Sequence, residues 1–320
     1  MFNHEKQERI LKELTNVILN SAAFAGIELV GLSGSVGREE KAATDSNLND
    51  LDFFVVAKTC KAEQKLKTEK ELRTITGTVF TDILFIERKR FRKKLRKEVI
   101  DQFLYDLLKG CIILHGKEDF CELMKKAREK EYKVTYKSSI TVLLTRLWCL
   151  TGPYIVEDES ILPIDEKFTS YQMKKAFSAI VDAALIYEKS YSSRNSTYKI
   201  TDFKKTDFYQ KMETTELMAL MEFYERGEGN FTKIYPALVK NYLFAIRHII
   251  RKDISKYANF PLRKLLLGSL IKKDKRLFIK SVIKRYHTLQ LINEFYQNGN
   301  KRVRRILSGN FKDIYSELIK

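Results

Sequence analysis

Two acidic residues separated by one position are the first residues in this chain that indicate chemistry. Asp50 and Asp52 flank Leu51 at the head of an apolar run that ends at Val56. Because alternate residues of a strand share one face, about 7 Å apart, the two carboxylates would project side by side. They repel each other unless a cation lies between them, and Mg²⁺ is a hard cation that binds carboxylate and phosphate oxygens. The spacing therefore predicts a metal and phosphate site.

A glycine loop precedes the two carboxylates. Gly34 and Ser35 follow the apolar run at 27–32; glycine lets backbone N–H groups approach phosphate oxygens, and the serine hydroxyl adds a donor. Arg38 lies just beyond the loop, where its guanidinium would bind phosphate through two parallel hydrogen bonds. An ion pair with the adjacent Glu39 is the alternative for this arginine. Gly34, Ser35 and Arg38 are therefore the predicted nucleotide-binding residues.

A third carboxylate stands alone in another apolar segment. Asp82 interrupts the β-prone run Thr78–Ile86, and a buried carboxylate is costly unless it is paired or coordinates a metal. If the three apolar runs are neighbouring strands, the three carboxylates surround one point. Such a set suits two Mg²⁺ ions about 3.5–4 Å apart in phosphoryl transfer. Asp50 and Asp52 would hold both ions, and Asp82 would hold the ion that activates the acceptor hydroxyl and act as its base.

These motifs, in this order, resemble the DNA polymerase β-type nucleotidyltransferase superfamily. The matching segments are Gly34-Ser35-Val36-Gly37-Arg38-Glu39, Asn49-Asp50-Leu51-Asp52-Phe53 and Thr81-Asp82-Ile83. The glycine-to-arginine spacing is similar to that of bacterial adenylyl- and uridylyltransferases, and Leu107–Phe120 resembles antibiotic-modifying members. The resemblance covers about the first third of the chain. It implies an enzyme that uses two Mg²⁺ ions to transfer a nucleoside monophosphate from an NTP, with ATP preferred, to a hydroxyl acceptor, releasing pyrophosphate.

Hydrophobic periodicity predicts the elements that position these residues. An amphipathic helix within residues 5–25 leads into the strands, and a short strand at Cys111–Leu114 ends the sheet. Beyond Lys117 the apolar spacing is helical. We therefore expect an α+β nucleotidyltransferase domain at residues 1–116, with a small mixed sheet and flanking helices. An all-α domain at residues 117–320 would follow and bind the acceptor and nucleotide.

Three finer expectations concern connections between these elements. A helix is expected at about Lys94–Lys109, after the basic cluster Arg88–Leu95. A polar loop is expected at Glu157–Lys167, and a break between helices near Ser192–Thr206.

The net charge of +18 bears on the partner. Residues 231–320 hold 21 Lys and Arg against 5 Asp and Glu, so the first 230 residues are nearly neutral. A basic block favours an anionic acceptor, either RNA or a phosphorylated metabolite, over a polycationic aminoglycoside. Lysine-rich solvated helix faces are an equally good explanation. Oligomeric state is left open.

Composition also predicts the compartment. The four cysteines form no CxxC pair, which indicates reduced thiols, and the N-terminus has no apolar signal-peptide core. No run approaches the roughly 18–20 apolar residues needed to span a bilayer. We expect a cytoplasmic protein without membrane contact. The competing hypothesis is a degenerate nucleotidyltransferase that binds RNA through its basic C-terminal part; an intact acidic cluster argues against it.

Overall fold

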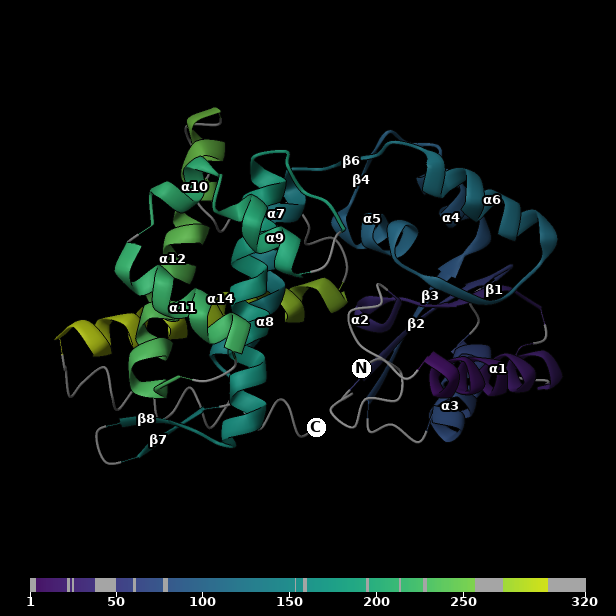
Figure 1. Cartoon of the computed structure of the whole chain (residues 1–320), viewed down its shortest axis with the longest axis horizontal. Coiled ribbons are helices and arrows are strands. Elements are labelled where there is room, and N and C mark those ends of the chain that lie inside the picture. The colour runs from purple at the N-terminus through teal and green to yellow at the C-terminus, as the bar shows by residue number, and fades with distance from the viewer. Residues whose placement is uncertain are drawn as a thin grey trace. The chain divides into compact units, whose positions relative to one another are not determined.

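The computed structural model describes most of the chain (Figure 1). The described residues are 4–21, 24, 26–37, 50–59, 62–76, 80–152, 154–157, 160–193, 196–212, 214–226, 229–256 and 273–298. They form two compact units. The first comprises residues 1–135 with 192–196, and the second comprises residues 136–191 and 197–320.

A four-stranded sheet forms the centre of the first unit. Its strands are β1 (Ile27–Leu32), β2 (Asp50–Ala57), β3 (Phe80–Glu87) and β5 (Ile112–Gly116), in the order β3-β2-β1-β5. Strand β2 runs parallel to β3, whereas β1 is antiparallel to both β2 and β5. The predicted small mixed sheet is confirmed, as is the prediction that the three apolar runs are neighbouring strands.

Helices cover both faces of this sheet. They are α1 (His4–Asn20), α2 (Gly34–Gly37), α3 (Ala62–Thr76), α4 (Arg88–Leu95), α5 (Gln102–Lys109) and α6 (Glu118–Glu129), with a small pair of strands β4 (Val99–Ile100) and β6 (Lys133–Val134). The alternation of β2 shows the division: Phe54 and Val56 share a core with α4, α5 and α6, whereas Phe53 and Val55 share a core with α1 and α3. Figure 1 shows these two helical layers on opposite sides of the strands.

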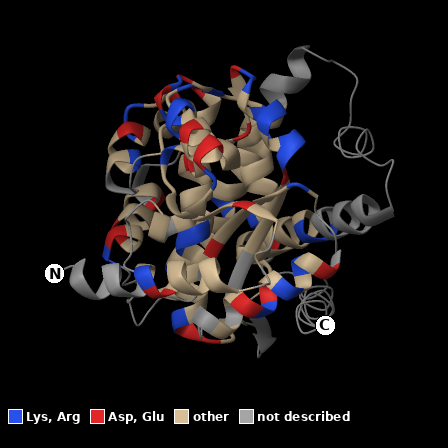
Figure 2. Ribbon diagram, turned by 90° about the vertical axis from the view of Figure 1, so that its right-hand side faces the viewer, with Lys and Arg blue, Asp and Glu red and all other residues tan. Residues whose placement is uncertain are grey.

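The second unit is mainly helical. Its helices are α7 (Lys137–Arg146), α8 (Glu166–Tyr187), α9 (Ser196–Phe203), α10 (Asp207–Gln210), α11 (Thr214–Arg226), α12 (Phe231–Lys256) and α14 (Lys273–Asn298), with a 3₁₀ segment η2 at Leu147–Leu150. Helix α8 is buried on most of its circumference, as expected for the central helix of a bundle. Figure 2 shows Lys and Arg interspersed with Asp and Glu along the ribbons.

The observed units differ from the expected domains in two respects. The first unit extends past residue 116 to Thr135, because Phe120, Met124 and Ala127 of α6 lie in its core. The second unit is not all-α, because β7 (Tyr154–Glu157) and β8 (Ser160–Pro163) form an antiparallel hairpin where a loop was expected. Each strand is only four residues long, which is too short for a strand period to be recognised in the sequence.

Two helical expectations also need correction. The helix expected at 94–109 is divided into α4, β4 and α5, because the Asp101 carboxylate accepts a hydrogen bond from the Leu104 N–H (2.9 Å) and starts a new helix. The expected break at 192–206 contains α9.

Three buried tyrosines tie the second unit together at the end of α7. The hydroxyl of Tyr242 donates to the Leu143 carbonyl (2.7 Å), and that of Tyr235 donates to the Leu150 carbonyl (2.7 Å). The Tyr154 hydroxyl donates to the Cys149 carbonyl (3.2 Å). A helix end leaves backbone carbonyls without intrahelical partners, so these phenols satisfy groups that burial would otherwise make costly.

We expect the free energy of unfolding of the second unit to fall as pH rises from about 9 to about 11. Burial raises the pKa of Cys149 from 9.0 to about 11, and it raises the pKa values of Tyr154, Tyr235 and Tyr242 well above 10.0. In this range the unfolded chain releases protons that the folded unit retains. Each such group therefore destabilises the fold by about 1.4 kcal/mol per pH unit.

Urea unfolding followed by the fluorescence of Trp148 measures this decline. Trp148 is the single tryptophan of the chain and lies beside Cys149 in η2. In Cys149→Ala the decline between pH 9 and 10 should be shallower, because only the tyrosines remain to titrate. An unfolding free energy that stays constant to pH 11 in the parent protein would contradict the linkage.

Candidate functional site

The parallel register of β2 and β3 sets the positions of the three predicted carboxylates. Asp52 is the register partner of Asp82, and Asp50 lies two residues earlier on β2, opposite Phe80. Neighbouring strands lie about 4.8 Å apart, and register partners share a face of the sheet. All three positions are therefore on one face, at the same end of two adjacent strands. The side chains of Asp50 and Asp82 lie outside the described residues.

The backbone of Gly34 lies directly against the carboxylate of Asp52. Gly34 has a φ of 65°, and a Cβ atom there would lie 1.9 Å from Asp52 Oδ2. No side chain larger than hydrogen fits this space, and the left-handed φ independently favours glycine. The glycine loop and the Asp-x-Asp strand, 16 residues apart at Gly34 and Asp50, therefore meet as the sequence predicts.

Backbone contacts fix the loop at this distance. The Ser33 N–H and hydroxyl both donate to the backbone carbonyl of Asp52, at 2.8 and 3.3 Å. The Gly37 N–H donates to the Ser33 carbonyl (3.1 Å), closing the turn of α2. A Cβ on Gly37 would lie 2.6 Å from the Gly110 carbonyl oxygen and 2.7 Å from that of Leu32. The turn is therefore packed between the end of β1 and the end of α5.

The site lies where the apolar cover of the sheet ends. Asp52 shares its face with Phe54 and Val56, which are fully buried under α4, α5 and α6. Asp52 itself is half-buried. On β3, Leu84 occupies the same face and is 39% exposed. The cover of this face therefore decreases from Phe54 to Asp52 along β2, and from β2 to the edge strand β3.

The structure describes only part of the other predicted site residues, Ser35 and Arg38. The backbone of Ser35 lies in α2, but its side chain is outside the described residues, and so is the whole of Arg38. Among the side chains that the structure describes, no three His, Cys, Asp or Glu gather at one point, and the side chains of Asp50 and Asp82 are not among them. Metal binding by Asp50, Asp52 and Asp82 stays a prediction.

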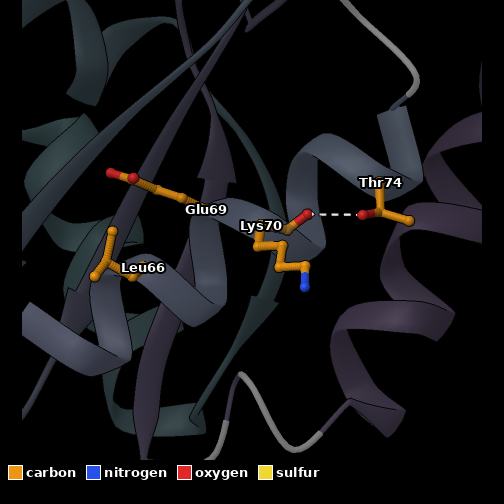
Figure 3. A pocket seen from close by; sticks show the side chains of 4 residues that line it. All are labelled: Leu66, Glu69, Lys70 and Thr74. Carbon is orange, nitrogen blue, oxygen red and sulfur yellow. Dashed lines mark hydrogen bonds between the residues drawn. The ribbon is translucent and has the colours of Figure 1, made fainter.

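A surface hollow of about 410 Å³ lies elsewhere, on α3. Figure 3 shows its four lining residues along a single helix: Leu66, Glu69, Lys70 and Thr74. The Thr74 hydroxyl donates to the Lys70 carbonyl (2.9 Å), and Leu66 is 67% exposed. Helix α3 packs on the sheet face opposite to that of Asp52, so this hollow does not belong to the same site.

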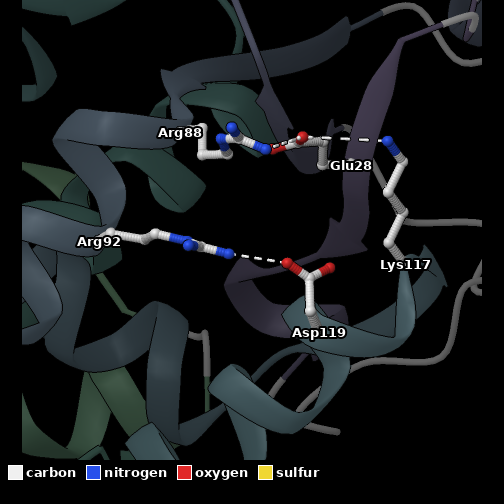
Figure 4. A network of polar contacts seen from close by, with 5 residues as sticks. All are labelled: Glu28, Arg88, Arg92, Lys117 and Asp119. Atoms are coloured by element: carbon white, nitrogen blue, oxygen red, sulfur yellow. Dashed lines mark hydrogen bonds and ion pairs between the residues drawn. The ribbon is translucent and has the colours of Figure 1, made fainter.

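Sequence reasoning missed a second carboxylate in an apolar strand. Glu28 is the extra residue of a β-bulge between Ile27 and Leu29, and its side chain is only 3% exposed. Arg88 at the start of α4 donates to Glu28 Oε1 (2.8 Å), and the Lys117 ammonium lies 3.9 Å from the same oxygen. Figure 4 shows both cations pointing at Glu28 from two helices. The sequence signal that could have revealed this ion pair is the single acidic residue, Glu28, within the apolar run 27–32.

This network is structural, because it lies at the far end of the sheet. Glu28 lies near Ala57 in the register, five residues or about 17 Å along β2 from Asp52. The neighbouring pair, Arg92 to Asp119 (2.7 Å), joins α4 to α6 but is largely exposed. The Glu28 pair therefore anchors α4 to the sheet, and the second pair adds a solvent-exposed contact.

Comparisons with known proteins add no relatives: no protein-family model matches the chain, and no curated protein matches it significantly. No helix among the described residues is both long and apolar enough to span a membrane. Support for a function comes from the residues of this chain.

Gly34→Ala should destabilise the protein more than Gly26→Ala. Both glycines have a positive φ, but a Cβ on Gly26 would meet only Gln64 Nε2 at 3.9 Å. The backbone penalty, about 1 kcal/mol, is therefore common to both. Gly34→Ala should lose a further 1–3 kcal/mol or so, because the Asp52 carboxylate must move. Urea unfolding followed by circular dichroism measures both, and equal losses would contradict the close contact.

Arg88→Met should destabilise the first unit by about 3 kcal/mol, because it leaves the buried carboxylate of Glu28 without its hydrogen-bonded cation. The matched change Arg92→Met removes a pair whose side chains are 43% and 57% exposed, and should cost about 1 kcal/mol or less. The same urea measurement compares them. A greater loss in Arg92→Met would reverse the assignment of the anchoring pair.

Proposed function

We propose that this protein is a Mg²⁺-dependent nucleotidyltransferase. It would transfer a nucleoside monophosphate from an NTP, with ATP preferred, to a hydroxyl acceptor and release pyrophosphate. The observation that carries the proposal is the contact between Gly34 and the Asp52 carboxylate, on a strand that aligns Asp52 with Asp82. One end of the sheet therefore holds both the turn at Gly34, whose backbone can approach phosphate, and the paired acidic positions Asp52 and Asp82.

The arrangement of acidic positions favours a cation. Asp52 and Asp82 are register partners on strands about 4.8 Å apart, and Asp50 is about 7 Å from Asp52 along β2. Carboxylates this close repel one another unless a cation neutralises them. The Asp52 carboxylate also lies in a cradle that a Cβ on Gly34 would fill. Oxygen ligands beside a turn open to phosphate suit Mg²⁺, which is bound by carboxylates together with substrate phosphates.

The residues would divide the reaction among them. Asp50 and Asp52 would hold both Mg²⁺ ions, and Asp82 would hold one of them. Bound Mg²⁺ would neutralise the phosphate charge and lower the pKa of the acceptor hydroxyl. Asp82 would take the proton from that hydroxyl, whose oxygen then bonds to the α-phosphorus. The bond from the α-phosphorus to the bridging oxygen breaks, and its electron pair leaves with pyrophosphate.

The glycine turn would position the triphosphate. Backbone N–H groups beside Gly34 can approach phosphate oxygens because no Cβ intervenes, and the hydroxyl of Ser35 would add a donor. Arg38 would bind phosphate charge from the segment that follows the turn. The mixed sheet with helices on both faces is consistent with the polymerase β-type fold that the motifs resemble. Free thiols at Cys111, Cys121 and Cys149 are consistent with the cytoplasm as its compartment.

Asp52→Asn should lower nucleotide transfer by about 100-fold or more, because several kcal/mol of charge stabilisation depend on the bound metal. Asp82→Asn should have a similar effect. Transfer is measured with each α-labelled NTP, Mg²⁺ and a cell extract as the source of acceptor. Asp207→Asn, the same change at an exposed position of the second unit, is the matched control and should leave transfer unchanged. Undiminished transfer in Asp52→Asn would refute the assignment.

Calorimetry gives a test that needs no acceptor. Binding of ATP should require Mg²⁺ and disappear with EDTA, because the carboxylates repel an unaccompanied triphosphate. Metal-independent binding of equal affinity would contradict the proposed clamp.

A further inference from the structure

Helix α4 carries an unusual concentration of positive charge. Its sequence, RKRFRKKL, contains six cations and no acid in eight residues. Arg96 and Lys97 continue the run directly after the helix, and both are exposed. The acidic neighbours Glu87 and Glu98 lie at the two ends, outside the run. Such a density of like charge is costly unless partners neutralise it or solvent screens it.

One side of the helix is neutralised within the protein. Arg88 pairs with Glu28 (2.8 Å), Arg92 with Asp119 (2.7 Å) and Lys94 with Asp101 (2.9 Å). Each of these acids comes from a different part of the unit, namely β1, α6 and the cap of α5. These three cations fasten the helix to the sheet and to its neighbouring helices.

The opposite side remains positive. Its exposed cations are Lys89, Arg90, Lys93, Arg96 and Lys97. None of the five forms an ion pair with a carboxylate among the residues that the structure describes. Lys89 and Lys93 lie one helical turn apart on this side of α4, about 6 Å along its axis, and Arg96 and Lys97 follow directly after the end of the helix.

This positive face is held rigidly. Phe91 and Leu95 are buried in the core beneath the helix, and the ammonium of Lys130 donates to the carbonyls of Leu95, Arg96 and Lys97 at 3.3, 3.4 and 3.0 Å. The Lys130 charge satisfies the C-terminal carbonyls of α4. The five cations therefore project from a fixed backbone, which lowers the entropy that a bound partner must remove.

We propose that the exposed face of α4 binds the phosphate backbone of an RNA strand. Exposed cations spread along α4 and the turn after it match a polymer of phosphates, whereas a small anion would need cations that converge on one point. Burial of Phe91 and Leu95 leaves the helix no apolar side chain to insert into a membrane. No exposed aromatic residue lies on α4 to stack on bases, so binding would be independent of sequence.

The position of α4 links this surface to the acidic site, a step that rests on the proposed function. Strand β3 runs from Asp82 directly into Arg88, six residues or about 20 Å along the strand. A phosphorylated metabolite is too short to span that distance, whereas an RNA strand bound along α4 can present a terminal hydroxyl to the carboxylates. The acceptor class that α4 favours is therefore RNA.

Fluorescence anisotropy with a labelled single-stranded RNA of about 20 nucleotides tests the surface without NTP or Mg²⁺. The variant K89Q/K93Q/K97Q should bind about 10- to 100-fold more weakly near 0.1 M salt, and the slope of log affinity against log salt should decrease by about 2, or roughly 0.7 per lost contact. The matched control K12Q/K67Q/K70Q removes three exposed lysines from α1 and α3, on the other face of the sheet, and should bind like the parent.

Unchanged RNA binding in the α4 variant, or an equal loss in the control variant, would overturn the proposal. So would failure of the parent protein to bind RNA, including the outcome that it binds only vesicles containing phosphatidylserine. Melting curves of both variants should match the parent, since all six side chains lie at the surface of their helices or the turn after α4. Asp52→Asn should bind RNA normally, so a failure of nucleotide transfer is distinguished from a failure of this surface.

Discussion

The first unit depends on a single close approach, that of the Gly34 backbone to the carboxylate of Asp52. A Cβ there would lie 1.9 Å from Oδ2, so the contact exists only because residue 34 is glycine. The two hydrogen bonds from Ser33 to the Asp52 carbonyl hold the strands at this distance. The antiparallel pairing of Leu32 with Phe53 then continues the register along β1. The backbone geometry at Gly34 and the register of β1 with β2 thus both determine where the glycine turn meets Asp52.

The parallel pairing of β2 with β3 adds the second constraint. A shift of one residue in this pairing would move Asp82 to the opposite face of the sheet. The proposed site therefore depends on the pairing of Asp52 with Asp82. The buried rows beyond it enforce that register: Phe54 and Val56 must face α4 to α6, while Phe53 and Val55 face α1 and α3. Hydrophobic patterning on both faces therefore fixes where the carboxylates lie.

Sequence patterns predicted the parts of the fold that obey a simple period. The strands at 27–32 and 51–57 could be predicted because the first apolar run is followed by Gly34 and the second is preceded by Asp50, and both of these residues also mark the site. The β7–β8 hairpin could not be predicted, because each of its strands has only four residues and shows no period. Asp82 and Glu28 show the limit for sites: both are lone acids in apolar strands, yet Glu28 binds Arg88 at the far end of the sheet. Composition alone cannot separate a metal ligand from an ion-pair partner, because both satisfy a buried carboxylate.

The net charge of a segment also gave an incomplete prediction of where polyanions could bind, because it sums residues that lie in different parts of the fold. Because the first 230 residues are nearly neutral, the sequence indicated the basic C-terminal block as the binding surface for an anionic acceptor. Much of that block lies outside the described residues. Yet some of the acidic residues that make this segment neutral are buried or lie away from the exposed cations of α4. Glu28 is buried, and Asp50, Asp52 and Asp82 occupy the end of the sheet where the proposed site lies. The outer face of α4 therefore remains positive within a neutral region, and electrostatic attraction of a polyanion depends on that local field rather than on the total charge.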